Sequence, residues 1–173
     1  MSDKSTSTVL ATSLLSDFRS SLNGDTGPSG AFFELTKRLA SRFSINKAVL
    51  LLRADAEAPF AAVSTWNNGQ IREGLSIRLP SESSLFEIVA GQGSVYTENF
   101  CNGFSGNFFE RKLLLEDDSR SFVIQPLKHD GNVIGLLGFS SGEPTAFTMF
   151  EEGMVEPIFN EFAQIIREKV SDI

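Results

Sequence analysis

The dipeptide Asp130-Gly131, set between two largely apolar runs, constrains the fold of this chain more than any other feature. The runs cover residues 121–129 and 132–140. A two-residue turn between antiparallel strands needs a positive φ angle at its central positions, and Asp-Gly is one of the pairs that meet this demand. The sequence therefore predicts a β-hairpin over residues 121–140, and with it an antiparallel sheet.

The hairpin also predicts which residues share a face of the sheet, because successive side chains of a strand point to opposite sides. In an unbroken ladder closed by this turn, Gln125 lies opposite Leu136. One face is then bulky and apolar, with Phe122, Ile124, Leu137 and Phe139. The second face mixes apolar and polar groups, with Val123, Gln125, Leu136, Gly138 and Ser140.

Most of the remaining chain follows a helical or an extended periodicity. Helices are predicted at residues 9–22, 32–43, 84–90, 107–115 and 148–170, and further strands at residues 46–53, 60–66, 71–79 and 94–97. Ser84 with Glu87, and Thr148 with Glu151, have the spacing of a capping box at a helix start. Pro157 fits either a kink or the first turn of the closing helix. This order predicts an α+β domain with a mostly antiparallel sheet.

Charge and composition exclude several classes of partner. The 173 residues fit one domain and carry a formal net charge of −7, with no block of Lys and Arg that would follow a phosphate backbone. We therefore expect no nucleic acid and no membrane as a partner. Cys101 is the only cysteine, and the chain shows neither a secretory signal nor the roughly 18 apolar residues of a membrane span, which predicts a cytoplasmic protein. Polar residues 1–8 are expected to form a flexible leader.

Three stretches, taken together, resemble the GAF domain family. Residues 79–93 are similar to the family's helix and the turn that follows it. Gln125-Pro126-Leu127, followed by residues 130–137, resembles its Pro-Leu hairpin, and residues 147–167 resemble its closing helix. The resemblance implies a GAF-like domain over residues 31–170. Its sheet would have five to six strands, with the terminal helices on one face and a helix-and-loop insert on the other.

GAF domains are, as a family, sensory or regulatory modules that bind small molecules or dimerise, and the resemblance can be tested type by type. Cyclic-nucleotide types carry an Asn-Lys pair where this chain has Ser140-Ser141, so a cyclic nucleotide is not expected as the ligand. Bilin types need a thiol closer to the Pro-Leu strand than Cys101, so a covalent bilin is not expected either. Free methionine sulfoxide reductases use several cysteines, since one thiol alone cannot resolve its own sulfenic acid. With one His129 and one Cys101 there is also no zinc set. We therefore expect no catalytic residue, no metal and no resident cofactor.

An apolar hollow with a few polar groups is typical of a small-molecule site, and a buried glutamine must find hydrogen bonds. We predict a pocket between the second hairpin face and the Phe-rich insert, lined by Gln125, Gly138, Ser140, Phe100, Phe104 and Phe108. Two alternatives stay open: Gln125 bonds only loop backbone, and the phenylalanines only fill a core. The predicted function is a small-molecule-binding sensory or regulatory domain. The alternatives are a dimerisation or protein-interaction module with a collapsed pocket and, third, a free methionine sulfoxide reductase.

The two ends of the chain supply a predicted homodimer interface. An apolar stripe recurs every four residues at Leu10, Leu14, Phe18 and Leu22, and the closing helix offers Phe162, Ile165 and Ile166. In the family that the chain resembles, terminal helices of this kind commonly pair across a twofold axis. A sensory domain of this type would act as such a homodimer or through a separate signalling protein.

Overall fold

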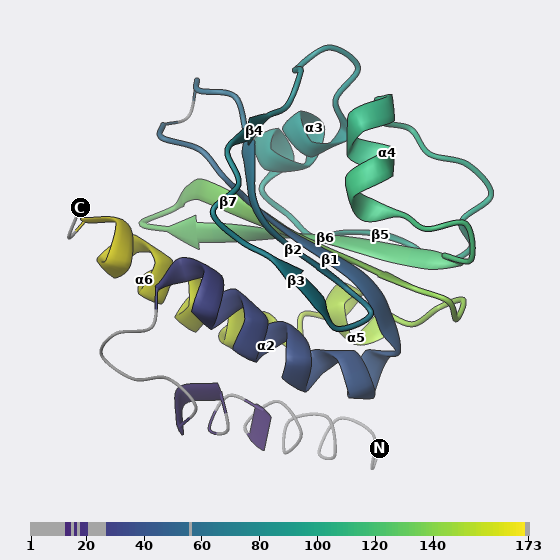
Figure 1. Ribbon diagram of the computed structural model, residues 1–173, viewed down its shortest axis with the longest axis horizontal. Helices are drawn as coiled ribbons and strands as arrows, with labels where there is room; N and C mark the ends of the chain where they lie inside the picture. The colour runs from purple at the N-terminus through teal and green to yellow at the C-terminus, as the bar shows by residue number, and fades with distance from the viewer. Residues whose placement is uncertain (1–12, 15, 17, 21–26, 56, 172–173) are drawn as a thin grey trace.

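The computed structural model describes residues 13–14, 16, 18–20, 27–55 and 57–171. Its elements follow the predicted order (Figure 1). The helices are α2 (Pro28–Phe43), α3 (Leu85–Gln92), α4 (Phe108–Leu114), α5 (Thr148–Glu151) and α6 (Glu156–Ser171). The strands are β1 (Ile45–Leu52), β2 (Ala61–Asn67), β3 (Gln70–Arg72), β4 (Ile77–Arg78), β5 (Tyr96–Glu98), β6 (Ser121–His129) and β7 (Asn132–Ser141). The predicted leader, Leu10 and Leu22 lie outside the described residues.

All described strand pairs are antiparallel, and the strand order is β3-β2-β1-β7-β6-β5, with β4 also paired to β2. The predicted α+β class is confirmed. The sheet has seven strands in the described part of the chain, where five to six were predicted. The difference arises because the predicted strand at residues 71–79 is interrupted at Gly74, whose φ of +69° ends β3 and allows β4 to start separately.

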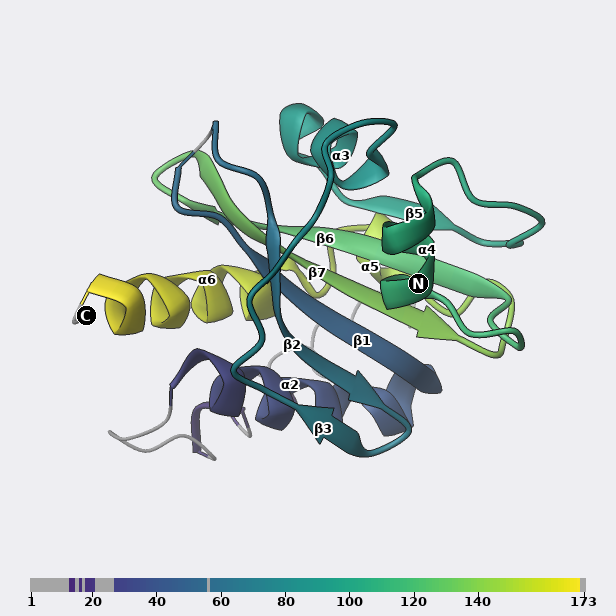
Figure 2. The same ribbon diagram turned by 45° about the horizontal axis from the view of Figure 1, so that its top comes forward.

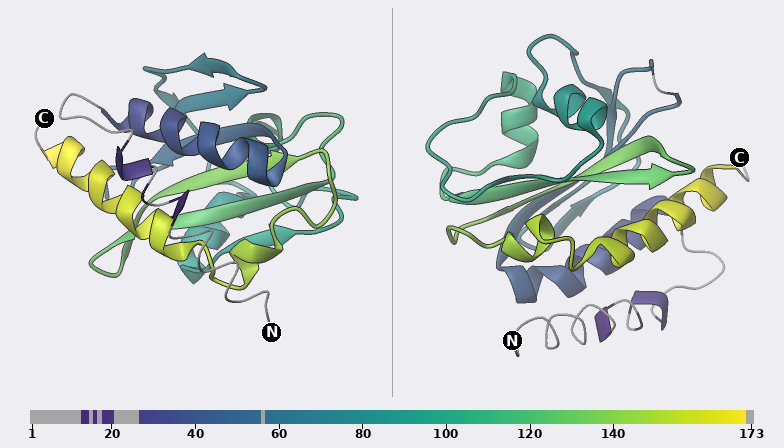
Figure 3. Two further views of the ribbon diagram at one scale, coloured as in Figure 1. Left: turned by 90° about the horizontal axis from the view of Figure 1, so that it is seen from below. Right: turned by 180° about the vertical axis from the view of Figure 1, so that it is seen from behind.

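Helices cover both faces of the sheet (Figures 2 and 3). Helices α2, α5 and α6 lie on one face, and α3 and α4 lie on the other, so the arrangement of terminal helices and insert matches the prediction. Strand β1 shows why both faces are apolar: Ala48 and Leu50 belong to the core under α2 and α6, while Val49 and Leu51 belong to the core under α3 and α4. A strand that is buried on both sides must be apolar on both sides.

The hairpin turn is confirmed, but its predicted register is wrong. Asp130 and Gly131 both have positive φ angles, +52° and +79°. A bulge then shifts the ladder between Leu127 and Lys128, so that Leu127 pairs with Gly135 and Gln125 pairs with Leu137. An extra residue on one strand shifts the pairing beyond it by one position. Each later side chain then has a different partner on the neighbouring strand and lies on the opposite face from the one predicted.

The bulge separates residues that were predicted to share a face. Val123, Leu137 and Phe139 belong to the core under α2 and α6. Phe122, Ile124 and Leu136 belong to the core under α3 and α4. Gln125 therefore lies on the face of α5 and α6, whereas Gly138 and Ser140 lie on the face of α4.

Of the two predicted capping boxes, one is confirmed in part and the other is wrong. Ser84 accepts a hydrogen bond from the Glu87 backbone at 3.0 Å, as predicted, but the Glu87 carboxylate pairs with Arg53 at 3.7 Å. The capping box predicted at Thr148 is wrong, because α5 begins after Phe147 without a side-chain cap. The predicted closing helix is split into α5 and α6, and Pro157 sits in the first turn of α6, where a missing N–H costs nothing.

The N-terminal helical residues pack against α6 of the same chain. Phe18 is fully buried, and its ring centroid lies 6.2 Å from that of Phe162. Arg19 forms an ion pair of 3.0 Å with Glu161. Two rings of the predicted dimer interface, one from each terminal helix, thus pack against each other within one chain. Among the helices of the described residues, none is long and apolar enough to span a membrane.

Candidate functional site

The six predicted pocket residues do not converge on one place. Gly138, Ser140 and Phe104 lie on the α4 side of the sheet, and the Phe104 ring packs on Phe122 with centroids 5.7 Å apart. Gln125 lies on the opposite side because of the bulge. Phe100 and Phe108 point to solvent, with 63% and 67% of their surface exposed. The predicted pocket is therefore divided between two sites, which are described in turn.

The space above Gly138 is filled by α4. A Cβ placed on Gly138 would lie 2.8 Å from Leu114 Cδ1 and 3.1 Å from Val49 Cγ1. The glycine is needed because the leucine of α4 descends onto the strand at this point. The predicted hollow at Gly138 is thus occupied by the side chain of Leu114, which is fully buried.

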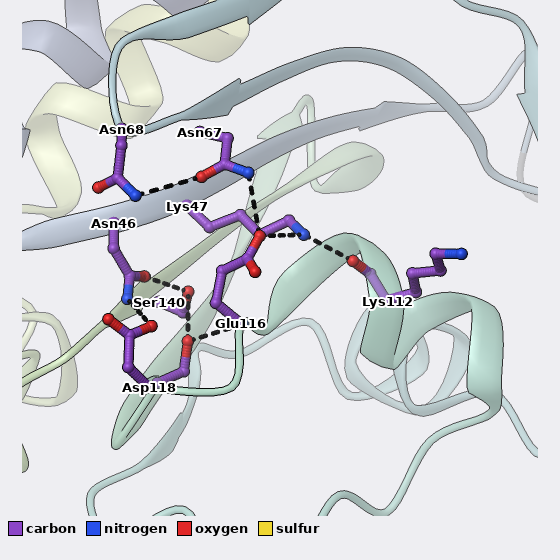
Figure 4. Close-up of polar contacts among 9 residues, drawn as sticks. Asn46, Lys47, Asn67, Asn68, Lys112, Glu116, Asp118 and Ser140 are labelled. Atoms are coloured by element: carbon purple, nitrogen blue, oxygen red, sulfur yellow. Dashed lines mark hydrogen bonds and ion pairs between the residues drawn. The ribbon is translucent and has the colours of Figure 1, made fainter.

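Ser140 belongs to a polar network below the end of α4 (Figure 4). Its hydroxyl donates to Asn46 Oδ1 at 2.8 Å and accepts from Ser119 Oγ at 3.2 Å. The Asn46 amide nitrogen donates to Asp118 Oδ1 at 3.2 Å. Ser140 therefore ties the loop after α4 to strands β1 and β7, and its hydrogen-bonding groups are used within the protein.

Lys47 holds the C-terminal end of α4 in the same network. Its Nζ donates to the backbone carbonyl of Lys112 at 2.8 Å and pairs with Glu116 Oε1 at 2.9 Å. Asn67 Nδ2 donates to the same Glu116 oxygen at 3.0 Å. An ammonium group at a helix C-terminus satisfies free carbonyls and favours the helix dipole.

Glu110 holds the N-terminal end of α4, and it is the least expected residue of this site. Its side chain is 0% exposed. The carboxyl group accepts from Leu85 N at 2.8 Å, from Phe86 N at 3.2 Å and from the hydroxyl of Ser84. It also accepts from Asn107 N at 3.2 Å and so completes a capping box at the start of α4. All four donors are neutral.

The donors around Glu110 form a carboxyl-binding site at the start of α3. Free N–H groups in the first turn of a helix, together with the helix dipole, favour an acidic group. The protein fills this site with its own side chain, which comes from another helix. Glu110 was missed at the sequence level, although Asn107-x-x-Glu110 has the capping-box spacing that was noted at Ser84 and Thr148.

Gln125 lines a separate cavity of about 230 Å³ on the opposite face. The cavity lies where β5 no longer covers β6, since the β5–β6 pairing stops at Ile124. Its wall also includes the turn after α3 and the junction between α5 and α6, with Glu151, Glu152 and Glu156. Gln125 is 6% exposed, and its amide nitrogen donates to the Pro126 carbonyl at 3.3 Å. The alternative that Gln125 bonds only loop backbone is not confirmed, because Pro126 is the next residue of the same strand, β6.

Cys101 lies half-buried in the insert and packs against the core cluster under α3 and α4. Its Sγ lies 3.6 Å from the Gly103 carbonyl oxygen. Burial, with a smaller effect of the Glu98 charge, raises the pKa of the Cys101 thiol. A raised pKa lowers the thiolate fraction at neutral pH and with it the reactivity. Within the described residues, no three His, Cys, Asp or Glu side chains gather in a way that would hold a metal ion.

Solved structures share this fold. The GAF domain of a phosphoenolpyruvate-protein phosphotransferase from Coxiella burnetii is 17% identical, with a TM-score of 0.75 over 95% of this chain and 97% of that chain. The corresponding domain from Acinetobacter is 12% identical, with a TM-score of 0.70 over 95% and 98%. Free methionine-R-sulfoxide reductase from Neisseria meningitidis, solved with its substrate, is 16% identical, with a TM-score of 0.62 over 93% and 92%.

These neighbours confirm the GAF fold that the three motifs indicated. No family model matches the sequence, and no curated protein sequence does so either. Signalling domains and reductases both occur among the neighbours, so the fold leaves a regulatory and an enzymatic function equally open. The residues of the site have to decide between them.

Proposed function

We propose that this chain is a small-molecule-binding regulatory domain in which α4 closes over the ligand site and Glu110 keeps the ligand-free site shut. The observation that carries the proposal is the buried carboxyl group of Glu110 at the start of α3. Its donors are backbone N–H groups and a hydroxyl, which would bind the acid group of a ligand equally well. A ligand acid can therefore replace Glu110 without leaving these donors unpaired.

The way α4 is attached suits such an exchange. The helix is seven residues long. Polar bonds hold its two ends, through Glu110 and Lys47, and one fully buried apolar side chain, Leu114, packs it onto the sheet. Polar bonds can be exchanged for bonds to water or to a ligand at a small net cost. When α4 moves outward, Leu114 leaves the space above Gly138, and an apolar part of the ligand takes its place. The ligand class is then a small organic acid with an apolar part.

The alternative is an interaction module with a permanently filled interior. The packing of Leu114 against Gly138 and of Phe104 against Phe122 favours it. In that case Glu110 is a fixed structural lock, and no acid replaces it. The exposed rings of Phe100, Phe108 and Phe109 would then belong to a surface for a protein partner.

The proposal includes no catalysis. A reductase of free methionine sulfoxide would need a second thiol to resolve the oxidised one, and this sequence has Cys101 alone. The raised pKa of that thiol also opposes a role as nucleophile. Signalling would proceed through a partner or through a homodimer, whose interface would use residues of the terminal helices other than Phe18 and Phe162.

Native mass spectrometry tests the binding proposal directly. The chain is purified without denaturation and then equilibrated with millimolar aliphatic and aromatic monocarboxylates. We expect a one-to-one adduct with at least one acid that has an apolar tail. A weaker adduct is expected in Leu114→Trp, because the ligand must displace a larger apolar side chain from the space above Gly138. If the wild-type protein shows neither a ligand retained from purification nor an adduct with an added acid, the interaction module is favoured.

A further inference from the structure

The cavity beside Gln125 supports an inference that is independent of the acid site under α4. It lies on the other face of the sheet, between β6, the turn after α3 and the α5–α6 junction. Its volume of about 230 Å³ equals roughly that of eight water molecules in the liquid. Any occupant is therefore small.

One nearly buried side chain of this cavity, Gln125, has a hydrogen-bond acceptor without a partner among the described residues. The Gln125 side chain is 6% exposed and makes one hydrogen bond, from its amide nitrogen to the Pro126 carbonyl. A carbonyl oxygen can only accept, so this bond fixes the nitrogen on the Pro126 side. The amide oxygen is then the atom left without a donor, and because it is not among the fully enclosed unpaired atoms, it is accessible to an N–H or O–H group of a ligand in the cavity.

The mouth of the cavity is acidic. Glu151 already accepts from Asn99 Nδ2 at 2.9 Å. The carboxylates of Glu152 and Glu156 have no partner among the described residues. Two unpaired carboxylates above an unpaired acceptor favour an occupant that carries positive charge and donates hydrogen bonds.

Lys128 lines the same cavity and, against its three carboxylates, leaves the lining with a net charge of −2. Its Nζ lies 3.6 Å from the position of a Cβ on Gly93, which is the C-terminal cap of α3. A lysine at that position interacts with the last carbonyls of the helix and its dipole. It forms no ion pair with the cavity carboxylates within the described residues.

A metal ion is a poor occupant for this cavity. Hard cations need several oxygen ligands that converge within about 2.0–2.6 Å of one point. The cavity carboxylates do not gather in this way, because no metal-holding group of acidic side chains exists among the described residues. Spread-out acceptors instead suit an organic cation whose charges are separated by a short chain.

We propose that this cavity binds a short aliphatic diamine. One ammonium group donates to the side-chain oxygen of Gln125, which lines the cavity. The other remains at the mouth, beside Glu152 and Glu156, and the two ammonium groups together balance the net charge of −2 of the lining. The chain's formal net charge of −7 further favours the encounter with a dication.

Isothermal titration calorimetry with 1,4-diaminobutane at low salt tests this proposal. We expect saturable one-to-one binding that weakens as salt is added, and no binding of the neutral isostere 1,4-butanediol. Gln125→Leu should weaken binding at least tenfold, since a hydrogen bond to a charged group is lost. Gln164→Leu, the same change at an exposed position of α6, should bind like the wild type.

A second pair of variants keeps the proposal testable if Gln125→Leu fails to fold. Glu152→Gln with Glu156→Gln removes both free carboxylates at exposed positions, and we expect at least tenfold weaker binding. Glu168→Gln with Glu161→Gln removes the same charge elsewhere on the chain and should have a small effect. Equal weakening by both double variants, wild-type affinity in Gln125→Leu, or no saturable binding to the wild type would each overturn the proposal.

Discussion

Replacing Glu110 with alanine should destabilise the domain in a way that added acetate repairs. The change leaves the backbone N–H groups of Leu85 and Phe86 without an acceptor, and each such group costs about 1–3 kcal/mol when it is buried. It also removes half of the capping box at Asn107, worth roughly 0.5–2 kcal/mol. These contributions add up to roughly 2.5–8 kcal/mol. We expect a loss of about 3 kcal/mol, near the lower end, because water can enter the space left by the side chain and bond to the N–H groups. For a chain of this length, that corresponds to a fall in melting temperature of roughly 6–12 °C.

Acetate should restore part of this loss, because it has the carboxyl group that the variant lacks. An affinity of about 10 mM at a concentration of about 100 mM stabilises the folded state by roughly 1.4 kcal/mol. The expected gain in melting temperature is then about 3–6 °C relative to sodium chloride of equal ionic strength. Thermal unfolding followed by circular dichroism measures both effects.

Two controls isolate the role of the site. Glu82→Ala removes an exposed carboxylate close to the start of the same helix, and acetate should not change its melting temperature. Acetamide, a neutral molecule of the same shape, should help Glu110→Ala less than acetate does. If Glu110→Ala melts within a degree of the wild type, or if acetate stabilises all three proteins equally, then the donors at α3 are not a carboxyl site.

Three further results are expected. Gly138→Ala should lower the free energy of unfolding, measured by calorimetry, by about 1–3 kcal/mol because its methyl group meets Leu114. Gly103→Ala, whose methyl group would have no atom within 4 Å, should unfold like the wild type, and equal melting temperatures of the two variants would contradict the filled interior. Because its pKa is raised, Cys101 should react with iodoacetamide more slowly at pH 7 than an unfolded cysteine peptide, and the reaction should become faster as the pH rises. Cys101→Ser should melt like the wild type, and a fast reaction of Cys101 at pH 7 would instead support the enzymatic alternative. Light scattering at high micromolar concentration should report a dimer, and a monomer there would remove the homodimer proposal.

Local sequence signals predicted the elements of the fold well. Asp130-Gly131 specified its turn because few residue pairs accept two positive φ angles. The apolar stripes of α2 and α6 specified the helices that cover one face. These signals act within a few residues, so they can be read without knowledge of the tertiary structure.

The division of residues between the two faces could not be predicted from the same signals. Both hairpin strands are apolar on both sides, so hydrophobicity does not distinguish one register from its neighbour. The bulge at Leu127 decides the register, and it placed Gln125 and Gly138 on opposite faces. The single predicted pocket was therefore wrong in its geometry, although Gln125 does line a cavity.

Both faces of the sheet have an apolar core, but the short helix α4 is attached differently from α2 and α6, and this difference points to the element that moves. The core under α2 and α6 is dominated by phenylalanine, and the rings of Phe43, Phe139, Phe150 and Phe159 contact one another in pairs. The closely packed rings have no hydrogen bonds to exchange, and a small opening loses packing at once. Helix α4 is instead held at its ends by Glu110 and Lys47, through bonds that water or a ligand can replace. Segments with fewer buried apolar contacts open at lower free energy. A ligand that binds this domain should therefore displace α4 and leave α2 and α6 in place.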